Sequence, residues 1–260
     1  MKAVKLLKKQ AKASLGGKWA TAVAGLLAVF AAALFVYLFY ATFGWVTGAF
    51  VTSAQEIDTV VIIKQFVLFF TTFLLAIALM PIINGFFRLC YNIANWREAN
   101  FADVFYFFKE TKRYFKAMQF NIFTTAKLFA AYFITFLGYN IFRIPVIETS
   151  FEITTLFIIN RSMLFALGFV WFLLFFIRII FSEFIFVDNE NARISEISRA
   201  TKVIFKHHKL DIILLNYSFI PWIALSFLVI PALYVIPYMT TTVATSTKWL
   251  LKLYKEGKLV

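Results

Sequence analysis

Residues 20–48 read ATAVAGLLAVFAAALFVYLFYATFGWVTG, within a longer stretch between Lys18 and Glu56 that carries no charged residue. A helix needs about 20 apolar residues to cross the hydrocarbon core of a bilayer. The run is also much longer than the roughly 7–15 apolar residues of a signal-peptide core. We therefore expect residues 20–48 to form a transmembrane helix that remains in the membrane as an anchor.

The composition of the whole chain also indicates that the protein lies in a lipid bilayer. Of its 260 residues, 62% are hydrophobic and only 15% are charged, whereas soluble domains have roughly half apolar and a quarter charged residues. A globular core of this size cannot hide so much apolar surface, and the exposed remainder would aggregate in water. The composition predicts an all-α, polytopic membrane helix bundle that forms a single domain over residues 1–260.

Further charge-poor stretches predict the other spans. The last uncharged stretch, between Asp211 and Lys248, holds 36 residues, which as one helix would measure about 54 Å against a hydrocarbon core of about 30 Å. Two short spans joined by a tight turn near Ile230-Pro231 fit this length better. The sequence therefore predicts about six spans, the first at 20–48 and the others at 63–87, 119–142, 163–187, 211–229 and 231–250.

The basic residues predict the orientation of these spans. Lys and Arg near span ends stay preferentially in the cytoplasm. On the six-span scheme 21 of the 26 basic residues lie on one side, against Lys64, Arg143 and Arg161 on the other, with Lys127 and Arg178 inside spans. Both termini are therefore expected in the cytoplasm. Because each Lys or Arg near an anionic membrane surface contributes about 1 kcal/mol of attraction, the net charge of +13 predicts contact with anionic lipid headgroups. No nucleic-acid-binding motif accompanies it.

Three segments on the predicted cytoplasmic side have amphipathic helical patterns, at 2–12, 101–116 and 188–209. In the second segment Phe101, Val104, Phe105, Phe108 and Phe115 have helical spacing, and Asn100 is placed to cap the helix. Such helices typically lie in the membrane interface with their apolar side inward. Membrane anchoring is the first interpretation, and docking of another membrane protein is the alternative.

Three charged residues fall inside predicted spans away from the first or last few positions: Lys127, Arg178 and Glu183. Placing a charge there costs roughly 3 kcal/mol on insertion scales, so such residues are paired or functional. The favoured interpretation is a charge pair between the third and fourth spans, with Lys127 and Glu183 as partners and Arg178 as the alternative partner of Glu183. An ion or substrate path is the alternative.

A second candidate surface is the basic end of the 188–209 segment, at His207, His208 and Lys209. Neighbouring residues on a helix point about 100° apart, and no Cys or carboxylate stands at ligand spacing, so we predict no metal site. Cys90 is the single cysteine. No nucleophile–base pair and no phosphate-binding loop is recognisable, and we predict no catalytic residue and no cofactor.

Short motifs near both ends of the chain have a recognisable order and spacing. The opening holds Leu7-Lys8, Ala11-Lys12, Leu15-Gly16 and Trp19, and the second half holds Asp188-Asn189, Thr201, His208-Lys209, Ser218-Phe219-Ile220, Trp222 and Pro237-Tyr238. This pattern resembles a bacterial integral-membrane family catalogued as domain of unknown function 975. The chain departs from the family pattern with His207 and Pro221 in place of Gly, and with Phe175-Phe176-Ile177-Arg178 in place of Pro-Gly. The resemblance implies a six-span bacterial membrane protein without an assigned activity.

These observations predict a non-enzymatic, multi-pass protein of the bacterial plasma membrane that acts as an accessory or scaffolding subunit and binds lipid or a partner. Transport of a small or amphipathic molecule is the alternative, and it rests on the interior charges and on the prolines of the last two spans. A lipid-modifying enzyme is a third interpretation, and it lacks the acid–base pair that such chemistry requires.

Overall fold

The computed structural model describes residues 2–50, 59–141, 151–226 and 228–257, and within them the chain is helical, with no β-strand. The expected all-α class is confirmed. The elements in chain order are α1 (Lys2–Leu15), α2 (Trp19–Val46), α3 (Thr59–Leu79), α4 (Pro81–Ala94), the 3-10 helix η1 (Phe101–Phe108), α5 (Thr111–Ile141), α6 (Phe151–Asp188), α7 (Ile194–Tyr217), α8 (Ile220–Leu225) and α9 (Val229–Lys255).

Among the described residues, three helical segments are long and apolar enough to cross a membrane: Trp19–Val46, Thr59–Ala94 and Phe165–Asp188. They coincide with the predicted spans at 20–48, 63–87 and 163–187. Large apolar side chains on them face outward, as at Trp45 and Phe69, which are 81% and 66% exposed. Exposed apolar side chains are favourable in lipid because the surrounding acyl chains are apolar too. The backbone also tolerates lipid, since a helix satisfies its own hydrogen bonds. These three segments support a membrane protein, as the composition predicts.

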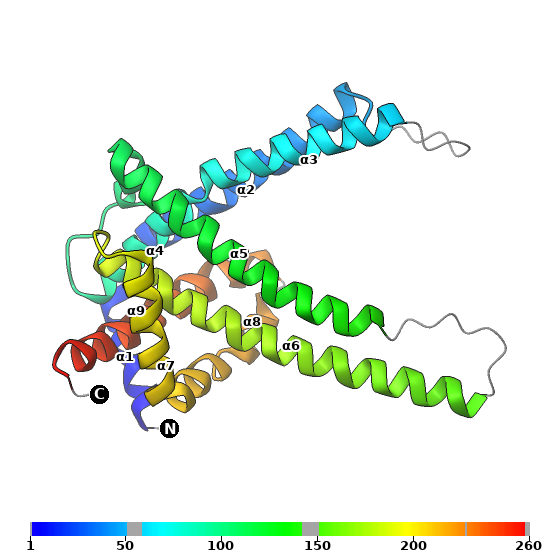
Figure 1. Cartoon of the computed structure of the whole chain (residues 1–260). Helices are drawn as coiled ribbons and strands as arrows, with labels where there is room; N and C mark the ends of the chain where they lie inside the picture. Colours follow the sequence, from blue (N-terminus) through cyan, green and yellow to red (C-terminus); the bar gives the residue numbers. More distant parts are fainter. Residues whose placement is uncertain (1, 51–58, 142–150, 227, 258–260) are drawn as a thin grey trace.

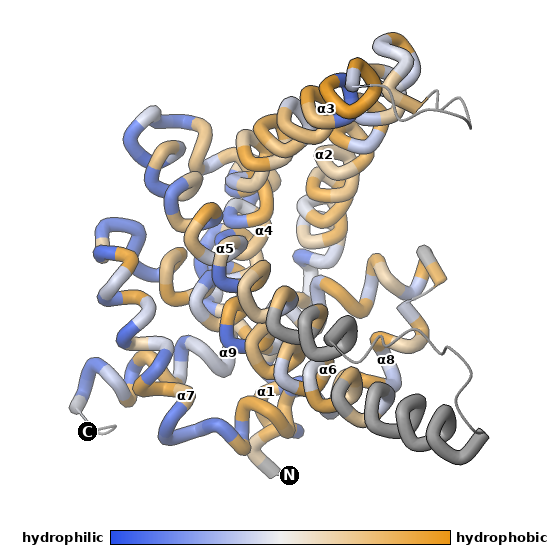
Figure 2. The backbone as a smooth tube through the Cα atoms, turned by 45° about the vertical axis from the view of Figure 1, so that its right-hand side comes forward, coloured by the Kyte–Doolittle hydropathy of each residue, from blue (hydrophilic) through white to orange (hydrophobic). Residues whose placement is uncertain are grey.

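Two long helix pairs diverge from a more compact region (Figure 1). α2 packs on α3 and α5 packs on α6. Where the pairs meet, α1, α4 and α9 contact one another, and α7 contacts α1 and α9. Hydrophobic residues run along α2, α3 and α6, and hydrophilic residues gather around α7 and the C-terminal part of α9 (Figure 2). Hydrophilic residues are therefore more frequent in the compact region than along the diverging α2 and α3.

Helix α4 is the centre of the compact region. Pro81 stands in its first turn, where a missing backbone N–H costs nothing, and most of its later residues are buried. A Cβ on Gly85 would overlap the backbone of Val104, so glycine allows η1 to lie directly against α4. Phe186 of α6 stacks on Phe107 of η1 and on Phe120 of α5, so these three elements share one aromatic core.

The amphipathic helix expected over 101–116 is divided in two. Asn100 and Asp103 form a capping box at the start of η1, as the sequence suggests, but η1 ends at Phe108 and α5 begins at Thr111. Val104 is buried inside the protein, whereas Phe101, Phe105, Phe108 and Phe115 are exposed. The apolar side is therefore shared between the protein core and the surface. The other two amphipathic segments are helical, in α1 and α7.

The C-terminal segment also differs from the expected hairpin. The stretch 211–229 is not one helix, because α7 ends at Tyr217 and the six-residue α8 follows before α9 begins at Val229. Pro231 lies in the first turn of α9, where proline is tolerated, so the helix break precedes Ile230-Pro231. The predicted span at 231–250 lies within α9. Residues 142, Arg143 and 227, which belong to predicted spans or loops, lie outside the described residues.

Candidate anion-binding site

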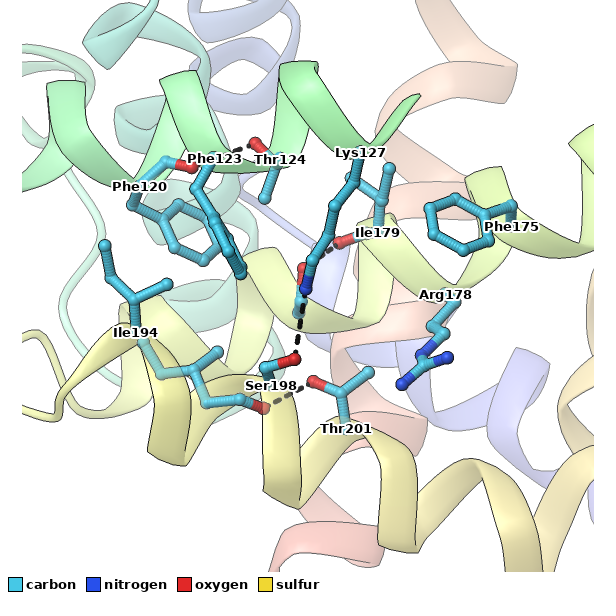
Figure 3. Close-up of a pocket in the computed structure, with 12 residues that line it drawn as sticks. Phe120, Phe123, Thr124, Lys127, Phe175, Arg178, Ile179, Ile194, Ser198 and Thr201 are labelled. Carbon is cyan, nitrogen blue, oxygen red and sulfur yellow. Dashed lines mark hydrogen bonds between the residues drawn. The ribbon is translucent and has the colours of Figure 1, made fainter. Parts of the chain in front are cut away.

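A cavity of about 120 Å³ lies where α5, α6 and α7 meet (Figure 3). Lys127 reaches into it from α5 towards Ser198 on α7, and Arg178 reaches from α6 towards the turn of α7 that carries Thr201. This volume accommodates several waters or one headgroup-sized anion. The lining residues are Phe120, Phe123, Thr124, Lys127, Phe175, Arg178, Ile179, Ser182, Ile194, Ile197, Ser198 and Thr201.

The same spacing on three helices produces this lining. Each helix contributes residues at positions i, i+3, i+4 and i+7, which fall on one face of an α-helix. On α6 these are Phe175, Arg178, Ile179 and Ser182. The corresponding sets begin at Phe120 on α5 and at Ile194 on α7. Three helix faces with the same mixture of apolar and polar residues therefore meet around one hollow.

The charges that line the cavity are both positive. Lys127 Nζ donates a hydrogen bond to Ser198 Oγ at 3.1 Å and lies 3.8 Å from the ring centre of Phe123. Among the described residues no carboxylate lies within salt-bridge distance of Lys127 or Arg178, and none of the lining residues is Asp or Glu. Since both cations are partly withdrawn from water, their attraction for an anion is stronger than at an open surface.

Hydroxyl groups complete the polar part of the cavity. Thr201 and Ser182 donate to backbone carbonyls of their own helices, at Ile197 and Ile179. Ser198 differs from them, because its oxygen accepts from Lys127 and its O–H stays available as a donor. The remaining Lys127 protons, the Arg178 guanidinium and this hydroxyl form a set of hydrogen-bond donors. Such a set is complementary to an anion, and charge-assisted hydrogen bonds of this kind are the strong ones.

Glu183, the third interior charge, lies outside this cavity. Its Oε2 accepts a hydrogen bond of 2.6 Å from Asn84 Nδ2, and Asn84 Oδ1 in turn accepts one of 2.6 Å from Asn121 Nδ2. All three side chains are buried. The described contacts contain no ion pair between Lys127 and Glu183, contrary to the favoured interpretation of the sequence. Each has a neutral partner on a different helix.

The basic end predicted at residues 207–209 is also separate from the cavity. His208 Nδ1 lies 3.2 Å from Asp211 Oδ2, its ring packs edge-on to Trp249, and its backbone departs from helical geometry, so that α7 is kinked there. His207 and Lys209 are exposed. Among the described residues no three His, Cys, Asp or Glu side chains are grouped so that they could hold a metal ion.

Motif residues from the two ends of the chain meet in the compact region. Lys8 Nζ donates to the carbonyl of Ser218 at 2.9 Å and lies 4.0 Å from the ring centre of Phe219. Tyr238 packs edge-on to Phe219, and its hydroxyl donates to the Lys8 carbonyl at 3.4 Å. Burial lowers the pKa of Lys8. These contacts fasten α1 to α9 and to the turn after α7. Thr201, another motif residue, lines the cavity between α5, α6 and α7.

The sequence singles out Lys127 and Arg178 as charges within apolar helices but does not predict their common cavity. The amphipathic pattern over 188–209 predicts the helix that closes the cavity, but it does not single out Ser198. The repeated i, i+3, i+4, i+7 spacing on three segments was the available signal. It did not reveal which three helices would face one another.

Comparison with known proteins agrees with the motif pattern. The model of the family described as "Protein of unknown function (DUF975)" matches residues 1–248 of the chain. Neither the comparison with curated proteins nor the comparison with solved structures found a match. The family match covers both groups of motif residues, from the opening of α1 to Pro237-Tyr238. The chain therefore belongs to the DUF975 family.

Proposed function

We propose that this protein is a non-enzymatic accessory protein of the bacterial plasma membrane that binds the acidic headgroup of a membrane lipid between α5, α6 and α7. It would cross the membrane about six times with both termini in the cytoplasm. The single observation that carries the proposal is the presence of Lys127 and Arg178, without a carboxylate partner among the described residues, in one hydroxyl-lined cavity.

The position of the cavity favours a lipid over a soluble anion. Arg178 precedes the end of α6 at Asp188 by ten residues, which corresponds to about 15 Å of helix. The α7 residues that close the cavity belong to a segment with the pattern of a cytoplasmic, interfacial helix. About 15 Å is half of the roughly 30 Å hydrocarbon core, so the cavity would extend from the interface beside α7 to below the headgroup level. A molecule that is already in the bilayer has easier access to such a position than a soluble anion. Phe123 and Phe175 on the cavity wall would contact the adjoining acyl chain.

Titration of the delipidated protein in neutral detergent tests this proposal. Short-chain phosphatidylglycerol should raise the thermal unfolding temperature more than the matching phosphatidylcholine, since only the former has a net negative charge. The double variant Lys127→Met/Arg178→Met should lose this difference. Each charge-assisted hydrogen bond contributes about 1.5–3 kcal/mol, so the loss in affinity should be at least about tenfold.

The matched control removes two positive charges from the exposed side of α7. Lys202 and Lys206 are exposed and do not line the cavity, so Lys202→Met/Lys206→Met should keep the preference for phosphatidylglycerol. Equal responses to the two lipids would contradict the proposal. An unchanged preference in Lys127→Met/Arg178→Met would contradict it as well.

Transport of an amphipathic anion is the second candidate, because a polar cavity does reach Lys127. A hollow of about 120 Å³ holds one headgroup, whereas a transport path must connect both membrane faces. Flux of a labelled anionic lipid between the leaflets of proteoliposomes distinguishes the two. Flux that requires Lys127 and Arg178 would favour transport, and binding without flux favours the accessory role.

A further inference from the structure

Trp96, just after α4, has a backbone conformation that is unusual for its residue type. Its φ is 56°, the only positive value among the described non-glycine residues. Its N–H donates to the carbonyl of Ile93, and the next N–H, of Arg97, donates to the carbonyl of Asn92. This is the helix-ending arrangement that glycine normally occupies, because a Cβ there is strained. The indole does not offset the strain by burial, since Trp96 is 66% exposed.

The exposed Trp96 ring lines a hollow of about 460 Å³ between the end of α4, α1 and α9. Trp249 on α9 is 52% exposed and lines the same hollow, together with Lys248 and Lys252. A second hollow of about 300 Å³ shares these two lysines and continues to Arg97. We call these two adjoining hollows together the tryptophan groove. Its walls present two indole rings and a row of cations.

Positive charge in the tryptophan groove exceeds the negative charge available to neutralise it. Asp188, which lines its second part, is already 2.7 Å from Lys255 Nζ and accepts a hydrogen bond from Tyr91. Glu256 lies 4.0 Å from Lys252. Among the described residues no carboxylate lies within salt-bridge distance of Lys248 or Arg97. The groove is therefore complementary to an acidic ligand.

We propose that the tryptophan groove docks a short acidic segment of a partner protein. Two adjoining hollows suit an extended peptide better than a single headgroup. Carboxylates of such a peptide would meet Lys248 and Arg97, while apolar side chains between them would pack on the indoles of Trp96 and Trp249. Tryptophan in this role supplies much of the binding energy of protein interfaces, and the charges supply the selectivity.

Fluorescence anisotropy of a labelled synthetic peptide tests this proposal on the full chain in neutral detergent. In the probe Glu alternates with Leu and Phe, and in the comparison peptide each Glu is replaced by Gln. We expect the acidic peptide to bind and the Gln peptide to bind at least about tenfold more weakly. Trp96→Gly should weaken binding of the acidic peptide to a similar extent. The same variant should keep or raise the thermal unfolding temperature, because glycine relieves the backbone strain.

The control variant Lys202→Gln/Lys206→Gln, which removes equal charge from the exposed side of α7, should bind the acidic peptide as the parent does, whereas Lys248→Gln/Lys252→Gln should not. Parent-like peptide binding by Trp96→Gly, with a lowered unfolding temperature, would overturn the proposal and make Trp96 a structural residue. Attachment of phosphatidylglycerol vesicles through Trp96 and Lys248, without peptide binding, would assign the groove to lipid. Self-association that depends on the same residues would assign it to a second copy of the chain.

Discussion

At the scale of single residues, the buried Glu183 side chain is held by one hydrogen bond from Asn84. It is 7% exposed and its carboxylate accepts from the Asn84 amide, with no cation in salt-bridge distance among the described residues. A buried group of this kind needs its hydrogen bond, because an unsatisfied amide costs about 1–3 kcal/mol. It does not need its charge.

We therefore expect Glu183→Gln to keep or raise the thermal unfolding temperature in detergent, because the amide oxygen of Gln also accepts from Asn84. Glu183→Leu should destabilise the protein by about 1–3 kcal/mol by leaving Asn84 without its acceptor. Lys127→Met combined with Glu183→Gln should show additive effects, since the two side chains have separate partners. Recovery of stability in this double variant would mean that Lys127 and Glu183 are in direct contact.

The three interior charges could be predicted from the sequence because ionisable residues are rare in apolar helices. Their partners could not, because partners depend on how each helix is rotated about its axis in the bundle. Lys127 is predicted to pair with Glu183 of α6, and its amine donates to Ser198 of α7 instead. The apolar surroundings of Lys127 gave no local signal of this rotation.

At the scale of elements, the close contact of α4 with η1 depends on one glycine. A Cβ on Gly85 would overlap backbone atoms of Val104, which cannot move alone. A Cβ on Gly25 would instead meet the end of the Leu89 side chain, which can change its rotamer. We expect Gly85→Ala to lower the thermal unfolding temperature much more than Gly25→Ala, with overpacking costs of about 1–3 kcal/mol or more at Gly85. Equal losses would contradict the described packing.

Element boundaries follow the sequence where a local signal exists. The capping pair Asn100 and Asp103 correctly marks the start of η1. The sequence predicts the C-terminal turn at Pro231, but proline is compatible with the first turn of α9, where Pro231 lies. The helices end earlier, around Ser218 and again after Leu225. The continuous helical spacing over 101–116 also hid the break between η1 and α5, which are separated only by Lys109 and Glu110.

At the scale of the whole molecule, the distribution of basic residues predicts that both termini are cytoplasmic. A reporter that is active only inside the cell should therefore be active when fused before Lys2 or after Val260. The same reporter inserted beside Glu56, between the first two predicted spans, should be inactive. An active C-terminal reporter of the opposite type, which works only outside the cytoplasm, would contradict an even number of spans.

The central claim, that the cavity between α5, α6 and α7 selects an anionic lipid, is tested most directly by photo-crosslinking in the native membrane. A photoreactive amino acid replaces Phe175 at the cavity, or Phe69 on the exposed surface of α3 as the control. Mass spectrometry then identifies the lipids attached. We predict that adducts at Phe175 are enriched in anionic lipid over the bulk membrane and lose this enrichment in Lys127→Met/Arg178→Met, while adducts at Phe69 match the bulk. Bulk composition at both positions would contradict the claim.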